Sequence, residues 1–298
     1  MAEQQIRLGT RGSALALAQA RWVADELGEA EIVEITTSGD RGQGPGDKSR
    51  FTREIDAALL AGEVDIAVHS AKDVPAELPE GIVIAAVPPR EDPADCYVGE
   101  AASLDDVADG TRIGTSSLRR RAQLLSLRPG LVVEELRGNV DTRLGKVGGS
   151  VDGAVLAAAG LQRLGRETEA AFPFDLDQLT PAAGQGALAL EARAGDVAAI
   201  GAATAIEDLV ADAELRAERA AVAALEASCH TPVGILARVD GRSLVLTGFA
   251  GLPDGSEWIR DRLSAEAAHP EAAGRELAAR MAGAGARELL SRAEELVG

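Results

Sequence analysis

The order of hydrophobic and polar positions along this chain predicts an α/β protein. Residues 64–68 (VDIAV) form a short run rich in β-branched residues, which is typical of a buried strand. Residues 5–10 (QIRLGT) are predicted to form another strand, and it leads into a predicted helix over residues 14–27 (ALALAQARWVADEL). Strands that alternate with helices indicate an open sheet with helices on its faces.

Part of this pattern occurs twice. Residues 7–10 (RLGT) resemble residues 112–115 (RIGT), and residues 64–73 (VDIAVHSAKD) resemble residues 151–160 (VDGAVLAAAG) in the same order along the chain. Two matched pairs in one order predict two similar α/β domains. In each copy a strand ends at Gly-Thr and a helix follows, which places backbone N–H groups and the positive end of a helix dipole at a ligand-binding cleft.

The last third of the chain has a different order of elements. A helical run from about residue 206 to residue 228 precedes three strand-like runs at residues 233–241, 242–251 and 257–265. One helix rich in Ala, Glu and Arg is predicted to end the chain. This order predicts a small α+β domain.

Segments punctuated by Pro and Gly separate these parts. Residues 85–98 and 179–193 are predicted to cross between the two α/β domains, and residues 39–50 are predicted to form a mobile glycine-rich loop. The predicted boundaries are residues 1–88 with 187–206 for domain 1, 89–186 for domain 2 and 207–298 for domain 3.

The composition narrows the class of protein. Hydrophobic residues make up 46% of the 298 residues, no apolar run is long enough to cross a bilayer, and residues 1–10 lack a signal-peptide core. A net charge of −18 argues against nucleic acid and anionic membranes as partners. Cys96 and Cys229 lie far apart and in no CxxC pair. We therefore expect no disulfide framework, no metal site and a reducing, cytoplasmic setting.

The positive charges are concentrated in one window. Between residues 112 and 163, nine basic residues stand against four acidic ones, an excess of five positive charges in a strongly acidic chain. A solvated helix face usually mixes its signs. This window is therefore predicted to bind an anionic ligand.

The segment at residues 67–75 (AVHSAKDVP) crowds polar side chains at the end of a predicted strand, where open α/β sheets bind ligands. In the second copy of the repeat, residues 156–160 (LAAAG) occupy the positions of residues 69–73 (HSAKD). The fold therefore accepts small apolar residues there, and the polar set of the first copy is predicted to be functional. The alternative is a helix N-cap beside a surface ion pair.

Seven motifs occur in order over nearly the whole chain. They are GTRGSALALAQA, AVHSAKDVP, REDP, GTSSLRRRAQL, LRGNVDTRL, LTPAAGQGAL and LEASCHTPVG. Each motif alone is weak, but the seven together are specific. The sequence resembles the hydroxymethylbilane synthases, which are also called porphobilinogen deaminases.

The resemblance implies a fold, an activity and a cofactor. The fold would be two similar α/β domains of the two-lobed binding-protein type around a cleft, plus a small α+β C-terminal domain. The activity would be that of a monomeric transferase that joins porphobilinogen units head to tail, with release of ammonia, into hydroxymethylbilane for porphyrin and haem biosynthesis. The cofactor would be a dipyrromethane bound by a thioether to Cys229 of EASCHTPVG.

The resemblance also implies a role for Asp73 as the catalytic aspartate. When ammonia leaves an aminomethylpyrrole, a cation delocalised onto the ring nitrogen remains, and a carboxylate near the pyrrole N–H stabilises it. His69 is expected to orient its neighbours rather than to act as a base.

The remaining implied contacts suit the acetate and propionate groups of each pyrrole, because guanidinium forks pair with carboxylates and stay charged. The residues implied to bind the cofactor are Ser70, Lys72, Thr115, Ser116, Ser117, Arg119 and Arg120. Those implied to bind the substrate are Arg11, Gln19, Phe51, Arg137, Gly138, Arg143, Arg163 and Gln185.

Two other classes of protein stay open on the residues alone. A non-catalytic two-lobed binding protein would share the duplicated domains and the arginines, but it would require neither Asp73 nor Cys229. If the protein were a scaffold or regulatory domain, the excess of basic residues between residues 112 and 163 would be unexplained. The mass of the intact protein separates the enzyme from the binding protein, because the enzyme should carry a dipyrromethane adduct.

Overall fold

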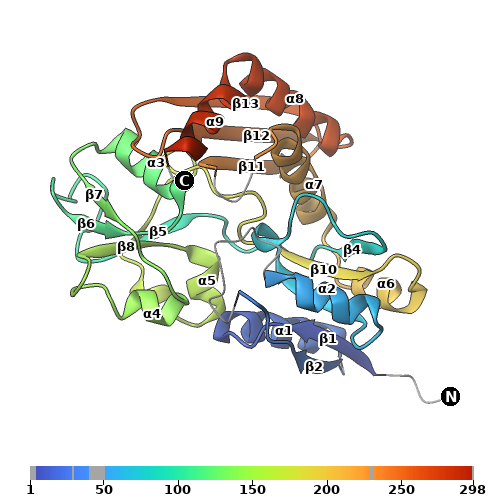
Figure 1. Cartoon of the computed structure of the whole chain (residues 1–298). Helices are drawn as coiled ribbons and strands as arrows, with labels where there is room; N and C mark the ends of the chain where they lie inside the picture. The colour runs from blue at the N-terminus through green and yellow to red at the C-terminus, as the bar shows by residue number, and fades with distance from the viewer. Residues whose placement is uncertain (1–4, 29, 40–50, 228–230, 297–298) are drawn as a thin grey trace. The chain divides into compact units, whose positions relative to one another are not determined.

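The computed structural model describes residues 5–28, 30–39, 51–227 and 231–296 (Figure 1). The chain forms two compact units. The first comprises residues 1–91 and 187–215, and the second comprises residues 92–186 and 216–298. The passages after residues 91 and 186 fall within the two segments predicted to be crossings, whereas the division into three domains stays a prediction. Most of the predicted glycine-rich loop lies outside the described residues.

The first unit contains a five-stranded sheet. Its strands are β1 (Ile6–Thr10), β2 (Ala30–Glu34), β3 (Ile66–Ser70), β4 (Ile82–Ala86) and β10 (Leu188–Arg193), and its helices are α1 (Ala14–Leu27), α2 (Arg53–Leu60) and α6 (Val197–Thr204). The strands lie in the order β2-β1-β3-β10-β4, and β10 is antiparallel to both of its neighbours (Figure 1). The sheet is therefore completed by a strand that arrives late in the chain.

The two faces of this sheet are covered by different helices because successive strand residues point to opposite faces. Ile66 packs with Val23 of α1 and Ala199 of α6 in one hydrophobic cluster. Ala67, the next residue of β3, packs with Ile55 of α2 in another cluster. All five side chains are almost completely buried, so β3 is fixed from both sides just before the segment HSAKD begins.

The second unit contains a sheet of the same design. Its strands are β5 (Asp95–Val98), β6 (Arg112–Gly114), β7 (Val132–Glu134), β8 (Gly153–Ala157) and β9 (Phe172–Pro173), and its helices include α3 (Leu118–Leu127), α4 (Val140–Leu144) and α5 (Ala158–Arg163). The strand order is β7-β6-β8-β5-β9, with β5 antiparallel to β8. Strand for strand this matches the first sheet, which confirms the predicted duplication.

The duplication extends to individual contacts. Arg7 pairs with Asp65 through an Nη2 to Oδ1 distance of 2.7 Å, and the backbone N–H of Arg7 also donates to that carboxylate at 3.0 Å. Arg112 makes the same two contacts with Asp152, at 2.6 and 2.9 Å. Each pair ties the first strand of its repeat to the start of the parallel strand beside it.

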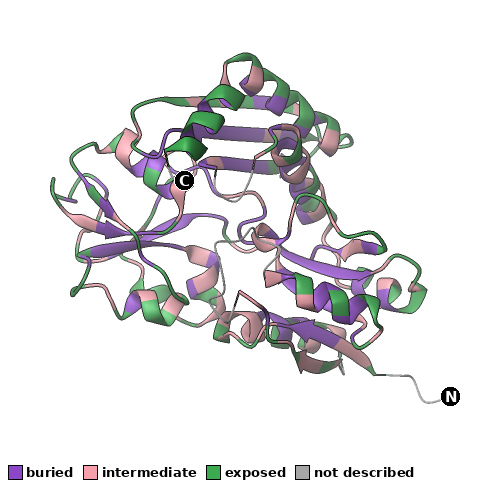
Figure 2. Ribbon diagram, in the orientation of Figure 1, coloured by how far each residue is buried: buried purple, intermediate pink, exposed green. Residues whose placement is uncertain are grey.

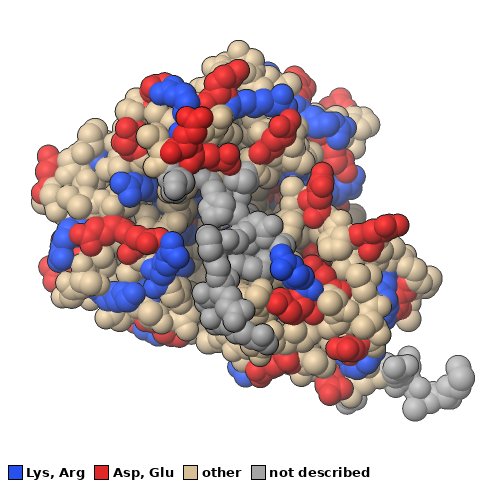
Figure 3. Space-filling view, in the orientation of Figure 1, with Lys and Arg blue, Asp and Glu red and all other residues tan. Residues whose placement is uncertain are grey.

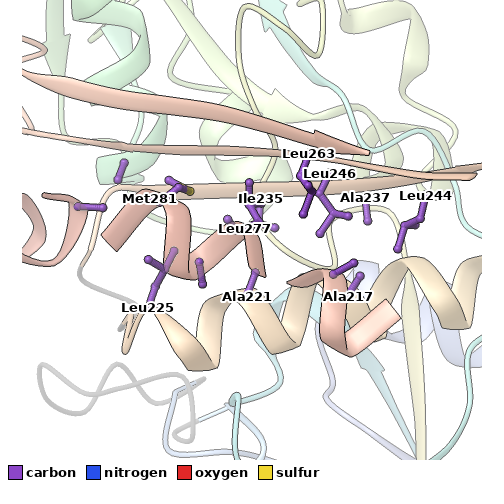
Figure 4. Packing of buried hydrophobic residues seen from close by; sticks show 14 of the residues in the cluster. Ala217, Ala221, Leu225, Ile235, Ala237, Leu244, Leu246, Leu263, Leu277 and Met281 are labelled. Atoms are coloured by element: carbon purple, nitrogen blue, oxygen red, sulfur yellow. The ribbon is translucent and has the colours of Figure 1, made fainter. Parts of the chain in front are cut away.

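The rest of the second unit is a three-stranded antiparallel sheet with helices on one face (Figure 4). Its elements are β11 (Val233–Asp240), β12 (Ser243–Gly251), β13 (Trp258–Glu266), α7 (Leu209–Ala224), α8 (Pro270–Gly283) and α9 (Ala286–Glu295), of which α7 begins in the first unit. Leu277 and Met281 of α8 pack against Ile235 of β11. Helices α7 and α8 lie so close that a Cβ on Gly274 would stand 2.1 Å from the carbonyl oxygen of Ala217.

The prediction of a single final helix was wrong. The segment forms two helices, α8 and α9, because Gly285 adopts a left-handed backbone with φ +98° between them, and glycine takes this conformation without a steric penalty. The three strands predicted in this region are confirmed. Most residues of β12 are buried, whereas most residues of β13 are not, and the outer faces of the helices are exposed (Figure 2). Among the described residues no helix is both long and apolar enough to cross a membrane.

Candidate active site

The segment HSAKD follows β3 at the carboxyl end of the first sheet. His69 and Ser70 are the last residues of β3, and Ala71–Asp73 form a single 3₁₀ turn. The backbone N–H of Ala71 donates to the carbonyl of Ala187 at 3.0 Å, which anchors the turn to the chain that leads into β10. Ser70, Lys72 and Asp73 are half-buried. The prediction that polar side chains gather at the end of this strand is confirmed.

Arg11, in the turn after the neighbouring strand β1, places a positive charge in the same unit. The guanidinium of Arg11 stacks over the ring of Phe51, 4.4 Å from its centroid. Arg11 and Asp73 both act electrostatically on His69, with opposite effects on its pKa. Gln19, by contrast, is buried on α1. Arg11, Phe51 and the HSAKD segment therefore belong to one region of the first unit.

A buried polar cluster lies beside this region. Asp56 of α2, His69 of β3 and Glu191 of β10 place ligand atoms within 4.8 Å of one another, and all three residues are buried. The Nε2 of His69 lies 3.6 Å from an Oε2 of Glu191, which is too long for a hydrogen bond. Among the described residues, this is the group whose donor atoms could hold a metal ion. Burial raises the pKa of Asp56, so protonation of the carboxyl is another way to lower the buried charge.

His69 gives a testable pH dependence. Burial lowers its pKa from 6.5 to about 4, with smaller effects from Asp73, which raises it, and Arg11, which lowers it. Between pH 4 and pH 6.5, His69 of the unfolded chain binds a proton that His69 of the folded protein does not bind. The stability due to neutral His69 is therefore complete above pH 6.5 and is lost as the pH falls towards 4, by about 3 kcal/mol in total.

We expect this loss to be absent in His69→Asn, which does not titrate. Urea unfolding of both proteins at several values between pH 7 and pH 4 measures the difference, and contributions of Asp56 and Glu191 that the two proteins share cancel in it. If the native protein instead gains stability relative to the variant as the pH falls, the carboxylates hold His69 as an imidazolium and the prediction is wrong.

The second unit places two adjacent arginines on helix α3. Arg119 and Arg120 are 4% and 5% exposed, and both donate to the wholly buried carboxylate of Asp95. Gln185 also donates to Asp95, from Nε2 at 2.8 Å, and to the carbonyl of Pro93 at 2.7 Å. Burial works to raise the pKa of Asp95, but the two guanidinium groups hold it far below its usual range. Asp95 is a functional candidate that sequence reasoning missed.

The N-terminus of α3 carries the predicted hydroxyl groups. Ser117 is the N-cap, and its Oγ accepts from the backbone N–H of Arg120 at 3.4 Å. Thr115 is buried at the end of β6, and its Oγ1 accepts from the N–H of Ser117 at 3.2 Å. Ser116 is exposed and donates to the carbonyl of Leu136 at 3.1 Å. This arrangement matches the strand–turn–helix predicted from RIGTSS.

The other predicted arginines have different surroundings. Arg137 is exposed and forms an ion pair with Glu135 at 2.6 Å, a surface contact that contributes little to stability. Arg163 of α5 donates from Nη2 to the carbonyl of Gly186 at 2.7 Å, and Arg143 of α4 is half-buried. Gly138 has φ +123°, and a Cβ there would also meet the side chain of Thr142. The LRGN turn therefore requires glycine.

Several charges of the basic window are neutralised within the fold. Arg112 pairs with Asp152, and Arg128 contacts Asp109, an acid outside the window. Asp95, which binds two of the arginines, also lies outside it. On the face that Figure 3 shows, basic and acidic side chains are interspersed. A count along the sequence therefore overstates the local excess of positive charge.

Two predicted features fall outside the described residues. These are Cys229, the predicted attachment point, and residues 40–50 of the predicted loop. The other cysteine, Cys96 of β5, is buried, and its Sγ donates to the carbonyl of Leu156 at 3.4 Å. Burial raises the pKa of Cys96 to about 12, so this thiol is not a nucleophile near neutral pH.

Comparisons with known proteins cover nearly the whole chain. Residues 6–200 match the family model "Porphobilinogen deaminase, dipyromethane cofactor binding domain", and residues 213–283 match "Porphobilinogen deaminase, C-terminal domain". The porphobilinogen deaminase of Thermus thermophilus is 48% identical over 294 residues, which is 95% of this chain and 97% of the relative. That of Rubrobacter xylanophilus is 49% identical over 297 residues, 95% of each chain. Among solved structures, the L-cystine solute receptor of Neisseria gonorrhoeae is 17% identical, with a TM-score of 0.40 over 70% of this chain and 87% of the receptor.

Proposed function

Because the chain belongs to the porphobilinogen deaminase family, we propose that Asp73, Cys229 and the arginines of the second unit carry out the family's reaction in this protein. The enzyme is a transferase that polymerises porphobilinogen into hydroxymethylbilane in tetrapyrrole biosynthesis. This activity, rather than reversible binding, is what the family performs. The roles of individual residues are our assignment.

The residues of the chain suit a dipyrromethane cofactor. Such a molecule carries several carboxylates, and the second unit offers two buried guanidinium groups against the single buried carboxylate of Asp95. Thr115 and Ser117 stand at the N-terminus of α3, where the helix dipole also favours an anion. Ser70 and Lys72 would hold further carboxylates, and Cys229 would supply the thioether sulfur. When bound, the cofactor supplies the pyrrole end from which the chain of rings grows.

Asp73 would act on the substrate. Loss of ammonia leaves a positive charge shared with the pyrrole nitrogen, and a carboxylate held at a fixed position stabilises that charge as it develops. The turn that carries Asp73 follows directly from a strand buried on both faces and is anchored to Ala187. Such rigid support lets a carboxylate act without reorganising during the reaction.

Each porphobilinogen brings an acetate and a propionate, so the growing product accumulates negative charge. Arginine suits this task because its fork stays charged and binds carboxylates through two parallel bonds. We assign Arg11, Arg137, Arg143 and Arg163 to substrate carboxylates, with Gly138 and Gln19 as neighbours. Phe51, whose ring already stacks with the Arg11 guanidinium, would contact a pyrrole ring. Gln185 binds Asp95 and Pro93, so its effect on the substrate would be indirect.

The observation that carries the proposal is the position of Asp73 and Lys72 in a rigid turn at the carboxyl end of β3, within a chain that matches the family over both of its models. The test combines two measurements on the purified protein. The intact mass should exceed the 30.7 kDa of the sequence by one dipyrromethane, and porphobilinogen should be consumed with release of ammonia. An unmodified mass together with no consumption would contradict the proposal.

We also propose that the enzyme works as a monomer in the cytoplasm without nucleic acid as a partner, and that it has the three domains predicted from the sequence. A net charge of −18 supports the absence of nucleic acid binding. The molar mass from light scattering tests the monomer, and limited proteolysis that releases a fragment beginning near residue 207 tests the third domain.

A further inference from the structure

His69 and Glu191 lie on the same face of the first sheet. In the antiparallel pairing of β3 with β10, Ala189 stands opposite His69 and Glu191 stands opposite Ala67. Because side chains alternate between the two faces of a sheet, His69 and Glu191 point to the face that carries Ala67, which α2 covers. Asp56 of α2 meets them there. We call these three residues the acid–histidine cluster.

The second unit fills the same place with hydrophobic side chains. Strands β8 and β5 correspond to β3 and β10, and Leu156 takes the place of His69 in the repeat. In the equivalent pairing of β5 with β8, Val98 takes the place of Glu191. Leu156 and Val98 are both buried and pack in one hydrophobic cluster. The fold therefore accepts a hydrophobic pair at these two positions.

The polar pair of the first unit costs free energy that a hydrophobic pair does not cost. Glu191 and His69 are 1% and 5% exposed. The Nε2 of His69 is fully buried without a hydrogen bond, 3.6 Å from Oε2 of Glu191. Buried polar groups in this state are expensive, and hydrophobic replacements of buried ionic groups are often neutral or stabilising. The benefit of the pair to the protein therefore lies outside the stability of the fold.

The carboxylate of Glu191 determines which ring nitrogen of His69 carries the proton. An ionised carboxylate only accepts hydrogen bonds, so it attracts an N–H group and repels a lone pair. Nε2 is the ring nitrogen that lies beside this carboxylate. Burial lowers the pKa of His69 to about 4, so the ring is neutral near pH 7 and has one N–H group. The proton therefore lies on Nε2, and Nδ1 keeps its lone pair.

The ring of His69 connects this buried carboxylate with the region of Asp73. His69 precedes Asp73 by four residues, and the charges of Asp73 and Arg11 both act on the ring. Positive charge develops beside Asp73 when ammonia leaves the substrate, and fixed groups of opposite polarity stabilise it. A lone pair on Nδ1, polarised by the carboxylate behind the ring, adds negative potential, and buried groups act with little screening.

We propose that Glu191 is a positioning residue for the reaction that acts through His69. It orients the neutral ring so that the lone pair of Nδ1 supports the cation that Asp73 stabilises. Asp56 completes the buried side of the cluster. This inference rests on the proposed function, because the cation forms only if the protein releases ammonia from porphobilinogen.

The second unit supplies the substitutions for the test. The double variant His69→Leu, Glu191→Val gives the first unit the two residues that the second unit has in this place. We expect its urea midpoint of unfolding to stay near that of the native protein. Its kcat should fall about tenfold or more, while its KM for porphobilinogen stays within about threefold. The fraction of protein that carries the dipyrromethane adduct, read from the intact mass, should not change.

A comparison of His69→Asn with His69→Leu tests the role of Nδ1 directly. The amide of Asn reaches about as far from the backbone as Nδ1, and its oxygen also accepts hydrogen bonds. We expect His69→Asn to keep more turnover than His69→Leu, although Leu suits a buried position better. A merely structural role would give turnover and stability the same order.

Thr247→Val on β12 is the matched control, because it also replaces a buried polar side chain of a strand by an apolar one of the same shape. It should leave kcat, KM and the adduct fraction unchanged.

The outcomes separate this inference from the function on which it rests. If the native protein carries the adduct and turns over porphobilinogen, but the double variant keeps the native kcat at native stability, the inference is wrong and the function stands. A native protein without adduct and turnover would end both. A lower adduct fraction in the double variant would also overturn the inference, because the cluster would then act on cofactor attachment.

Two further results would contradict the role of Nδ1. The first is a kcat of His69→Asn no higher than that of His69→Leu, and this comparison decides the matter even if the double variant does not fold. The second is one equivalent of zinc or manganese in the purified protein that is absent from the double variant. A metal ion instead of a proton would then occupy Nε2.

Discussion

Replacement of Asp73 by Asn is expected to lower the turnover of porphobilinogen by about a hundredfold or more while the protein stays folded. Neutralising a preorganised group that faces developing charge commonly costs this much. The substitution keeps the size and shape of the side chain. The measurement is steady-state turnover beside a thermal melt, with the exposed Asp25→Asn of α1 as the control.

Asp73→Glu refines this prediction. It keeps the charge but moves it by about one methylene group, so the loss of turnover should be smaller than for Asn and should measure how closely position matters. If Asp73 served only to cap the turn, the order would be reversed, because Asn is a good cap and Glu is not. Turnover that is higher for Asn than for Glu, at equal melting temperature, would show that the catalytic assignment is wrong.

Cys229→Ser is expected to give folded protein without the dipyrromethane adduct and without measurable turnover. A serine hydroxyl is a far weaker nucleophile than a thiol, so the thioether has no replacement. The intact mass should fall to that of the sequence alone, and the rate of porphobilinogen consumption should fall to background.

Cys96→Ser is the matched control, since these are the two cysteines of the chain. Its thiol is buried in β5 with a pKa raised to about 12 by burial, which leaves almost no thiolate at neutral pH. We expect this variant to keep both the adduct and the activity. An adduct that survives in the Cys229 variant and disappears in the Cys96 variant would move the attachment point.

Local patterns predicted the elements well. Residues 14–27 form α1 with the bounds predicted, and the repeated RLGT and RIGT segments form β1 and β6 in equivalent places of two sheets. These features depend on residues that are close together in the sequence, and the hydrophobic pattern of a strand or a helix is made by such residues. The prediction of one final helix was wrong because Gly285 has a left-handed backbone, which interrupts a segment whose composition is helical throughout.

Partners distant in sequence could not be predicted. Asp95 meets Arg120 across 25 positions and Gln185 across 90, and no periodicity encodes such contacts. The same reason explains why the sequence could not show that Arg119 donates to the carbonyl of Thr180 and Arg120 to that of Val155. One signal was available for Glu191, an acid inside the otherwise apolar run LALEA, since a buried acid needs a partner.

The place of β10 in the first sheet has a consequence for how the chain folds during translation. Strands β3 and β4 each pair with β10 on one side, and β10 begins at residue 188. While the ribosome is still translating the second α/β repeat, β3 has one unpaired edge and β4 has no neighbour. Exposed strand edges attract other chains. The nascent polypeptide is therefore most vulnerable to aggregation between the emergence of β4 and that of β10, the interval in which a chaperone would protect it most.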